Sequence, residues 1–157
     1  MRRKEREKDR AFALDVVDQC VYAVLGCADA EGAPYAVPLS IARSGEDIYF
    51  HCARRGKKTD ILRDSPRACL VCVGDVRVPK GRFAVEYESA VVTGTAREVT
   101  GDEEKVRALE LISRRHTPEN MHDFDAEVAR FLAVTAVWKV RIEEISGKCK
   151  KYDDKDA

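Results

Sequence analysis

The chain has 157 residues, and 28 basic side chains (Lys and Arg) balance 28 acidic ones, so the formal net charge is zero. Such a chain has no overall field to attract nucleic acid or an anionic membrane, and any anion recognition must be local. No apolar stretch approaches the roughly 20 residues of a membrane span, and the charged start 1–6 lacks the apolar region of a secretory signal. We expect a single cytoplasmic domain over residues 1–157, with no nucleic-acid or membrane partner.

The elements follow from apolar periodicity and turn-forming residues. In chain order they are a short helix ending near Gln19, strands 20–28 and 35–42, a strand 48–52, a helix 59–63, strands 68–78 and 83–99, helices starting at Asp102 and at Met121, and a strand 134–145. We expect the charged segments 1–10 and 148–157 to be loose arms. Gly94 is expected to mark a bend or bulge.

This pattern predicts a mainly β fold with helices, in the α+β class. There are six strands in mostly antiparallel order, and helices are inserted at the start, after the third strand and before the last. Such an order favours a small antiparallel barrel or strongly curled sheet with helical plugs over a parallel, doubly wound sheet.

Six cysteines raise the question of a metal or disulfide site. Cys69 and Cys72 are spaced Cys-x-x-Cys, but they lie in a predicted strand, where residues three apart point to opposite faces. They could not hold one ion, and no second ligand pair follows at a suitable spacing. We predict no metal site and expect most of the thiols to be small buried groups. Cys52 could instead border a binding site, although structural packing is the favoured interpretation.

The segment 51–60 carries the most functional information. The apolar strand ends at His51, and a glycine and two lysines, Lys57 and Lys58, precede the start of a helix. Unpaired N–H groups of a first helical turn and the helix dipole attract anions, and two ammonium groups add to this. The pattern predicts a phosphate site. The alternative is a solvated helix start.

Pro38 gives a further constraint on the strand 35–42. A proline inside a strand cannot donate to a neighbouring strand, so this strand is expected at an edge or at a bulge. A ligand can take the place of the missing neighbour there.

Taken together, these segments resemble the FMN-binding split β-barrel proteins related to pyridoxamine 5'-phosphate oxidase, and among them the nitroimidazole-resistance (Nim-type) flavoproteins. The resemblance is carried by the stretches 1–4, 32–40, 49–58 and 142–148. It implies a six-stranded antiparallel split barrel, and a homodimer that binds two FMN molecules at the subunit interface.

The resemblance also implies roles for individual residues. Val37, Pro38, Leu39 and Ser40 would line the isoalloxazine ring and ribityl chain, and Lys57 or Lys58, with Lys58 favoured, would hold the phosphate. His51 would face the phosphate or the substrate side of the flavin, as a tentative catalytic residue. Tyr87, Ser89 and Trp138 would reach the partner's cofactor, although core or interface packing explains them equally well.

The expected function is an oxidoreductase that passes electrons from a reduced donor to a small electrophile such as a nitro-aromatic. The alternative is a non-catalytic protein that binds or carries a flavin, haem or deazaflavin. The C-terminal segment 146–150 lacks the arginine-rich substrate site of the true oxidases, which disfavours pyridoxal phosphate synthesis. The segment 116–119 also departs from the Nim-type pattern, so no substrate specificity is transferred.

Overall fold

A computed structural model describes residues 2–151 of the chain. The helices are α1 (Arg10–Gln19), α2 (Lys57–Asp64), α3 (Asp102–His116) and α4 (Phe124–Phe131), with 3₁₀ turns η1 (Lys4–Arg6) and η2 (Pro118–Asp123). The strands are β1 (Glu7–Lys8), β2 (Ala23–Ala28), β3 (Pro34–Leu39), β4 (Ala42–Ser44), β5 (Asp47–Ala53), β6 (Arg67–Arg77), β7 (Glu86–Val99) and β8 (Thr135–Lys150).

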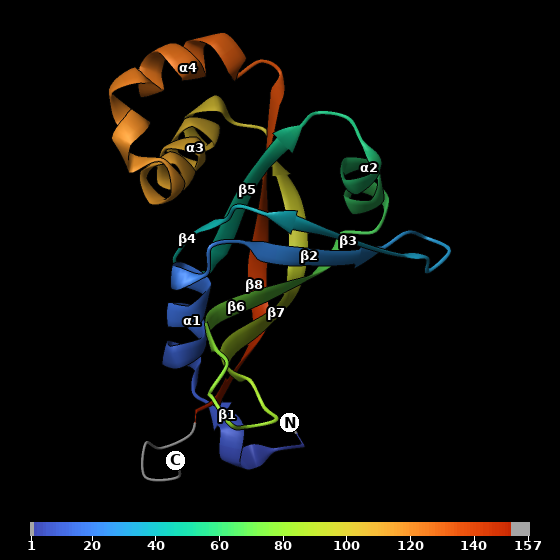
Figure 1. The fold of residues 1–157 in the computed structure, drawn as a ribbon. Helices are drawn as coiled ribbons and strands as arrows, with labels where there is room; N and C mark the ends of the chain where they lie inside the picture. Colours follow the sequence, from blue (N-terminus) through green and yellow to red (C-terminus); the bar gives the residue numbers. More distant parts are fainter. Residues whose placement is uncertain (1, 152–157) are drawn as a thin grey trace.

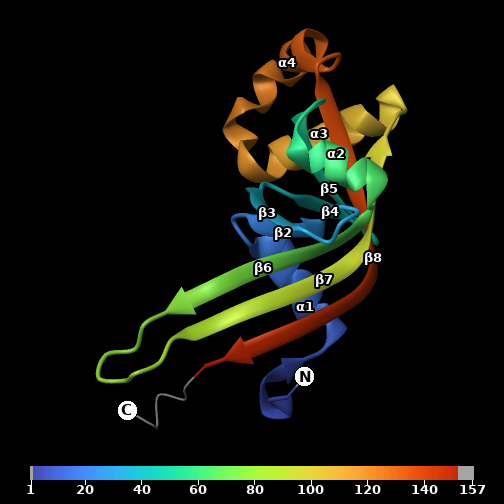
Figure 2. The ribbon, with the colours of Figure 1, turned by 90° about the vertical axis from the view of Figure 1, so that its right-hand side faces the viewer.

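All strand pairings among the described residues are antiparallel, and they form one sheet in the order β3-β2-β6-β7-β8-β5-β4, with β1 on β8. The sheet curls on itself, and the long strands β6, β7 and β8 run side by side past α1 (Figures 1 and 2). The mainly β, α+β class is confirmed. The strand count is eight rather than six, because the predicted strand 35–42 divides at Ser40 and Ile41 and because the N-terminus adds β1.

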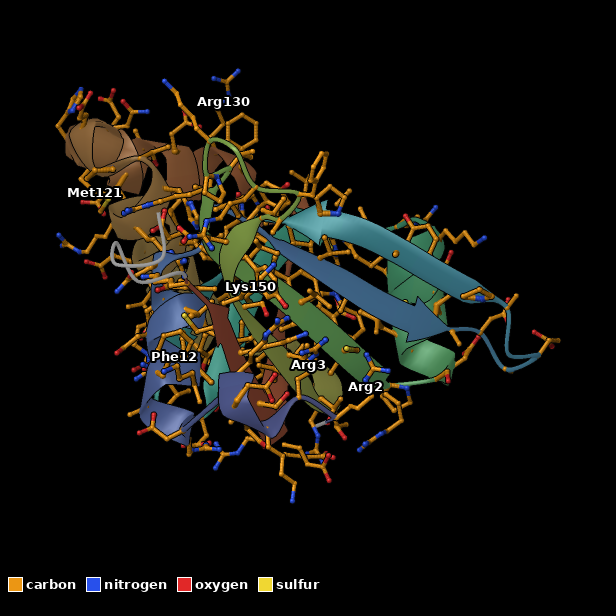
Figure 3. All side chains as sticks on the ribbon, turned by 60° about the horizontal axis from the view of Figure 1, so that its bottom comes forward. Arg2, Arg3, Phe12, Met121, Arg130 and Lys150 are labelled. Atoms are coloured by element: carbon orange, nitrogen blue, oxygen red, sulfur yellow. The ribbon has the colours of Figure 1, made fainter. Side chains whose placement is uncertain are left out.

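Both ends of the described part, 2–10 and 148–151, contain regular secondary structure. The expected loose arm 1–10 contains η1 and β1, and Glu7 and Lys8 pair with Lys148 and Gly147 of β8. The expected loose tail therefore begins inside a strand. Figure 3 shows this end, with Phe12 on α1 and Lys150 at the end of β8. These polar segments form strands because they pair with segments that are distant in the sequence. The rest of the expected loose tail, residues 152–157, lies outside the described part.

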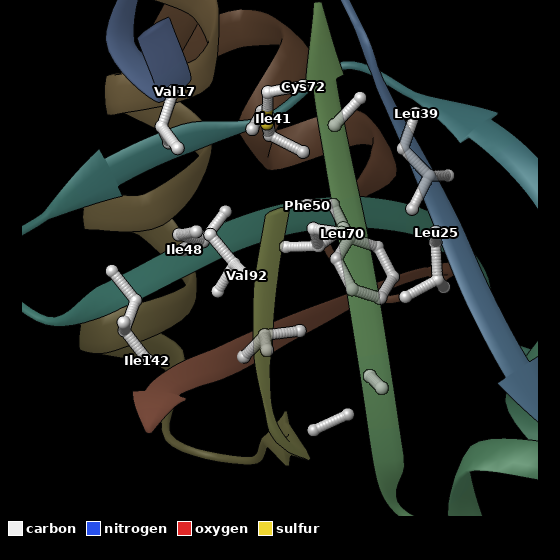
Figure 4. Close-up of a cluster of buried hydrophobic side chains, with 14 of the residues drawn as sticks. Val17, Leu25, Leu39, Ile41, Ile48, Phe50, Leu70, Cys72, Val92 and Ile142 are labelled. Carbon is white, nitrogen blue, oxygen red and sulfur yellow. The ribbon is translucent and has the colours of Figure 1, made fainter. Parts of the chain in front are cut away.

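The main core fills the barrel interior. Its largest fully buried side chains include Trp138, and also Phe50, Leu25, Ile41, Ile48 and Leu70, which are labelled in Figure 4. The helix α1 closes one end, because Ala13, Val16 and Val17 recur at helical spacing and are all buried. A second cluster lies on the other side of β5 and β8, where Ala108 and Ile112 of α3 pack on Tyr49 and Val137.

The bend expected at Gly94 is confirmed as a register shift. Thr93 pairs with Glu144 and Gly94 with Ile142, which leaves Glu143 of β8 as an extra residue. A Cβ atom on Gly94 would lie 1.9 Å from the carbonyl oxygen of Arg141. Only glycine allows β7 and β8 to approach so closely here.

We expect Gly94→Ala to destabilise the protein by about 3 kcal/mol or more, because the new methyl group would overlap backbone rather than a movable side chain. Gly101→Ala is the control, since its Cβ would meet nothing within 4 Å, and should cost no more than about 1 kcal/mol. Chemical denaturation measures both. Equal losses in the two variants would contradict the explanation.

Candidate functional site

Two of the open strand edges in the described part of the chain belong to β3 and β5. β3 pairs only with β2, so its other edge is open, as the position of Pro38 predicted. β4 covers β5 only along Asp47–Tyr49, which leaves Phe50–Ala53 uncovered on that side. Open edges present unpaired N–H and C=O groups, which can bind water, a ligand or another chain.

The helix α2 begins where the open half of β5 ends. Gly56 precedes it with φ of 147° and ψ of 164°, a conformation that glycine adopts most readily. The hydroxyl of Thr59 donates to the carbonyl of Gly56 at 2.7 Å and fixes this start. The helix begins at Lys57, two residues before the predicted start, so both lysines lie in its first turn.

The two lysines reach toward the two open strands. The ammonium of Lys57 lies 5.3 Å from the ring centroid of Tyr35 on β3, and that of Lys58 lies 5.3 Å from the ring of Phe50 on β5. Neither ammonium has a carboxylate partner among residues 2–151. Asp60 lies in the same turn but pairs with Arg63, so the two ammonium groups have no direct carboxylate partner within the described chain.

Two thiols lie close to Lys58. Burial raises the pKa of both Cys27 and Cys52, and the charge of Lys58 opposes the shift. Both remain protonated at neutral pH, so they are weak nucleophiles. The packing role favoured for Cys52 agrees with this.

The predicted cofactor-lining segment of β3 has two different faces. Pro38 is exposed, whereas Val37 is half-buried and packs against the barrel core. Leu39 is only 9% exposed and belongs to the core, although it also lines a surface pocket together with Pro38 and Ser40. Ser40 is exposed, in the break between β3 and β4.

His51 lies on the opposite face of β5 from Phe50. Alternation along the strand turns His51 toward α3 and α4, where it lines a cavity of about 290 Å³. Desolvation lowers the pKa of its imidazole, and the charges of Lys58 and His116 lower it further. The side chain of His51 therefore points away from Phe50, the ring that lies beneath Lys58.

The three residues expected to reach a partner's cofactor do not share one surface. Tyr87 and Ser89 lie on the outer face of β7, the face opposite the buried Ala90 and Val92. Lys148 stacks over the ring of Tyr87 at 5.4 Å, and its hydrogen bond lowers the pKa of the phenol. Trp138 is 2% exposed and lies inside the barrel core, so core packing is the correct interpretation for it.

A row of apolar residues on the outer sheet face was not singled out from the sequence. Pro38, Val24, Val71 and Val91 are neighbours in register across β3, β2, β6 and β7. Val71 and Val91 remain 37% and 38% exposed. The alternation in 68–73 was the available signal, since it puts Val71 on the face opposite the buried Leu70 and Cys72.

Among the described residues, no group of three or more His, Cys, Asp or Glu side chains could hold a metal ion. Cys69 and Cys72 do point to opposite faces, because Cys72 is buried in the core and Cys69 is half-exposed on the outer face. No helix in 2–151 is both long enough and apolar enough to cross a bilayer.

The sequence model of the pyridoxamine 5'-phosphate oxidase family matches residues 9–149 of this chain. The chain therefore belongs to that family, and its fold is the antiparallel split barrel that the resemblance implied. The search of curated proteins found no match.

Solved structures of the same fold come from several bacteria. A candidate 5-nitroimidazole antibiotic resistance protein from Bacteroides thetaiotaomicron is similar with a TM-score of 0.74 and 23% identity, covering 90% of this chain and 84% of that one. An FAD-binding protein from Mesorhizobium loti is similar with a TM-score of 0.70 and 24% identity, and the match covers 93% of this chain and 98% of that one. An FAD- and haem-binding protein from Mycobacterium smegmatis is similar with a TM-score of 0.77 and 22% identity, and the match covers 96% of this chain and 77% of that one.

We predict that Lys58→Met raises the pKa of His51, because it removes a positive charge that disfavours the imidazolium ion. Lys57→Met is the matched control and should leave that pKa in place. Nitrogen-detected NMR titration of the imidazoles measures both. An unchanged His51 pKa in the Lys58 variant would contradict the proposed coupling.

The same titration has a consequence for stability. The folded-state pKa of His51 lies below its ordinary value of 6.5, so the unfolded chain binds the proton more tightly. His51 therefore reduces the free energy of unfolding progressively as the pH falls below 6.5, and it has no such effect well above pH 6.5.

Proposed function

We propose that this protein is an FMN-dependent oxidoreductase that binds its cofactor between two copies of the chain. The observation that carries the proposal is the pair of uncompensated ammonium groups, Lys57 and Lys58, in the first turn of α2 and beside two open strand edges. Membership of the pyridoxamine 5'-phosphate oxidase family supports it.

The first turn of α2 suits a phosphate monoester. Such a group carries between one and two negative charges at neutral pH, which two lysines can balance. The first backbone N–H groups of a helix have no acceptor within the helix, and they can donate to phosphate oxygens. Gly56 keeps a Cβ atom away from the position where these groups would meet the ligand.

The open edges suit a flat ring with a polar rim. The edge of β3 offers backbone donors and acceptors that no strand in the described chain uses, and Pro38 leaves its exposed face apolar. A bound flavin would supply two-electron redox chemistry. The chain would bind and orient it, and would exclude water from one side.

A second copy of the chain is the proposed cover for the outer sheet face. The row formed by Pro38, Val24, Val71 and Val91 crosses four strands without a break, and such contiguous exposed apolar surface marks interaction sites. Tyr87 and Ser89 lie on the same face and would come close to the partner's site.

Native mass spectrometry of gently purified protein should show a dimer that carries two FMN molecules. The double variant Lys57→Ala/Lys58→Ala should weaken FMN binding by about 100-fold or more, because each charge-assisted hydrogen bond contributes about 1.5–3 kcal/mol. Flavin fluorescence titration measures the affinity.

Arg107→Ala is the matched control, since Arg107 is an exposed cation on α3 that pairs with Glu103. It should leave FMN affinity unchanged. A colourless monomer that fails to bind added FMN would overturn both the cofactor and the dimer.

Turnover separates an oxidoreductase from a flavin carrier. We expect the reduced protein to pass electrons to a nitro-aromatic or a quinone at least about tenfold faster than free reduced FMN does, because the site holds the reactants together. Stopped-flow absorbance measures this rate. If reduction by a nicotinamide and reoxidation by these acceptors are no faster than for free FMN, the carrier function stands instead.

A further inference from the structure

A cavity of about 290 Å³ lies between the helices α3 and α4 and the sheet. Leu109, Ile112 and Ser113 of α3 form one wall, and Phe124, Val128 and Phe131 of α4 form the other, with His51 and Thr135 contributed by the sheet. It lies on the face of β5 opposite Phe50. It is therefore separate from the lysine pair, and the inference below does not depend on the proposed function.

The helix α4 covers this space without filling it. Phe124, Val128 and Phe131 are spaced to form one apolar stripe, yet no residue of Phe124–Phe131 is buried, and Phe131 stays 40% exposed. An apolar wall that faces an unfilled space loses dispersion contacts that a well-packed interior would provide. A ligand of matching shape would restore them.

Four polar residues line the cavity, namely His51, Ser113, Glu127 and Thr135, and His51 itself is an exposed residue. The imidazole of His51 makes no hydrogen bond with any described residue, whereas His116 and His122 each contact a backbone carbonyl. A neutral imidazole offers one donor and one acceptor. The geometry thus provides an apolar slot with a few polar groups, among them the imidazole of His51, which is the usual form of a small-molecule site.

Size and charge narrow the class of occupant. An apolar cavity of about 150 Å³ holds one benzene ring, so a space of about 290 Å³ has room for two fused rings. No lysine or arginine lines it, and the carboxylate of Glu127 lies among its lining residues. An anionic ligand would find no partner there and would meet a like charge.

We propose that the α3–α4 cavity is a binding site for a planar, uncharged two-ring aromatic molecule that accepts a hydrogen bond from His51. The ring system lies between the apolar stripes of the two helices. The acceptor atom faces the imidazole. Selection against anions distinguishes this site from the cationic start of α2.

Quinoline tests the proposal, because it has two fused rings, one acceptor nitrogen and no charge at neutral pH. In the purified full-length protein, quinoline should shift the methyl NMR signals of Leu109, Ile112 and Val128 in a saturable way. Naphthalene-2-sulfonate, of similar width but anionic, should bind about tenfold more weakly or worse. Quinoline shifts that are absent up to millimolar concentration, or that fall mainly on other methyl groups, would overturn the proposal.

Two variants on one helix sharpen the test. Val128→Phe fills the cavity with a ring and should weaken quinoline binding about tenfold or more, whereas Ala129→Phe adds the same ring on the exposed side and should leave it unchanged. Ser113→Leu places a larger side chain on the opposite wall of the cavity, and it replaces Val128→Phe as the test if that variant fails to fold. His51→Leu should weaken quinoline binding several-fold. Equal affinity in the wild type and all of the cavity variants would refute the site.

Discussion

The open strand edges of the candidate site depend on a chain break between β3 and β4. If the strand 35–42 ran on without interruption, it could pair along the whole of β5, and neither strand would keep an open edge. The break at Ser40 and Ile41 is held from α3, because His116 Nε2 contacts the carbonyl oxygen of Ile41 at 2.8 Å. Arg115 beside it donates to the carbonyls of Val17 and Cys20. The end of α3 thus fixes the point at which the barrel splits.

The alternation of β5 gives the molecule two chemically different sides. Phe50 and Cys52 face the barrel and the ammonium of Lys58, while Tyr49 and His51 face α3. His51 feels the charge of Lys58 across the strand, which is one reason for its lowered pKa. The two sides of this strand therefore differ in chemistry, with the ammonium of Lys58 over the ring of Phe50 on one side and a largely apolar cavity on the other, since neighbouring residues of a strand point to opposite faces.

Sequence patterns predicted those parts of the candidate site that depend only on neighbouring residues in the chain. Pro38 predicted that β3 lies at an edge of the sheet, and the glycine and lysines before Thr59 indicated the start of α2. The alternation of strand residues predicted that Cys69 and Cys72 lie on opposite faces. Contacts between distant segments could not be foreseen in the same way. Trp138 is buried because β8 lies between β7 and β5, and the polar N-terminus is ordered because Glu7 meets Lys148. The α3–α4 cavity likewise depends on how two amphipathic helices are placed, and their periodicity specifies only which faces are apolar.

The placement of acidic residues explains how a chain of zero net charge can hold a local cationic site. Most of the cations near the barrel have carboxylate partners: Arg63 pairs with Glu98, Arg67 with Glu143, Lys139 with Glu104 and Arg43 with Asp18. These partners come from β7, β8, α3 and α1, and none of them reaches the first turn of α2. Charge that is paired in this way contributes little to the field at a distance, whereas the unpaired lysines act together with the helix dipole. The proposed preference of this turn for anions would therefore depend as much on where the carboxylates are as on the two lysines themselves.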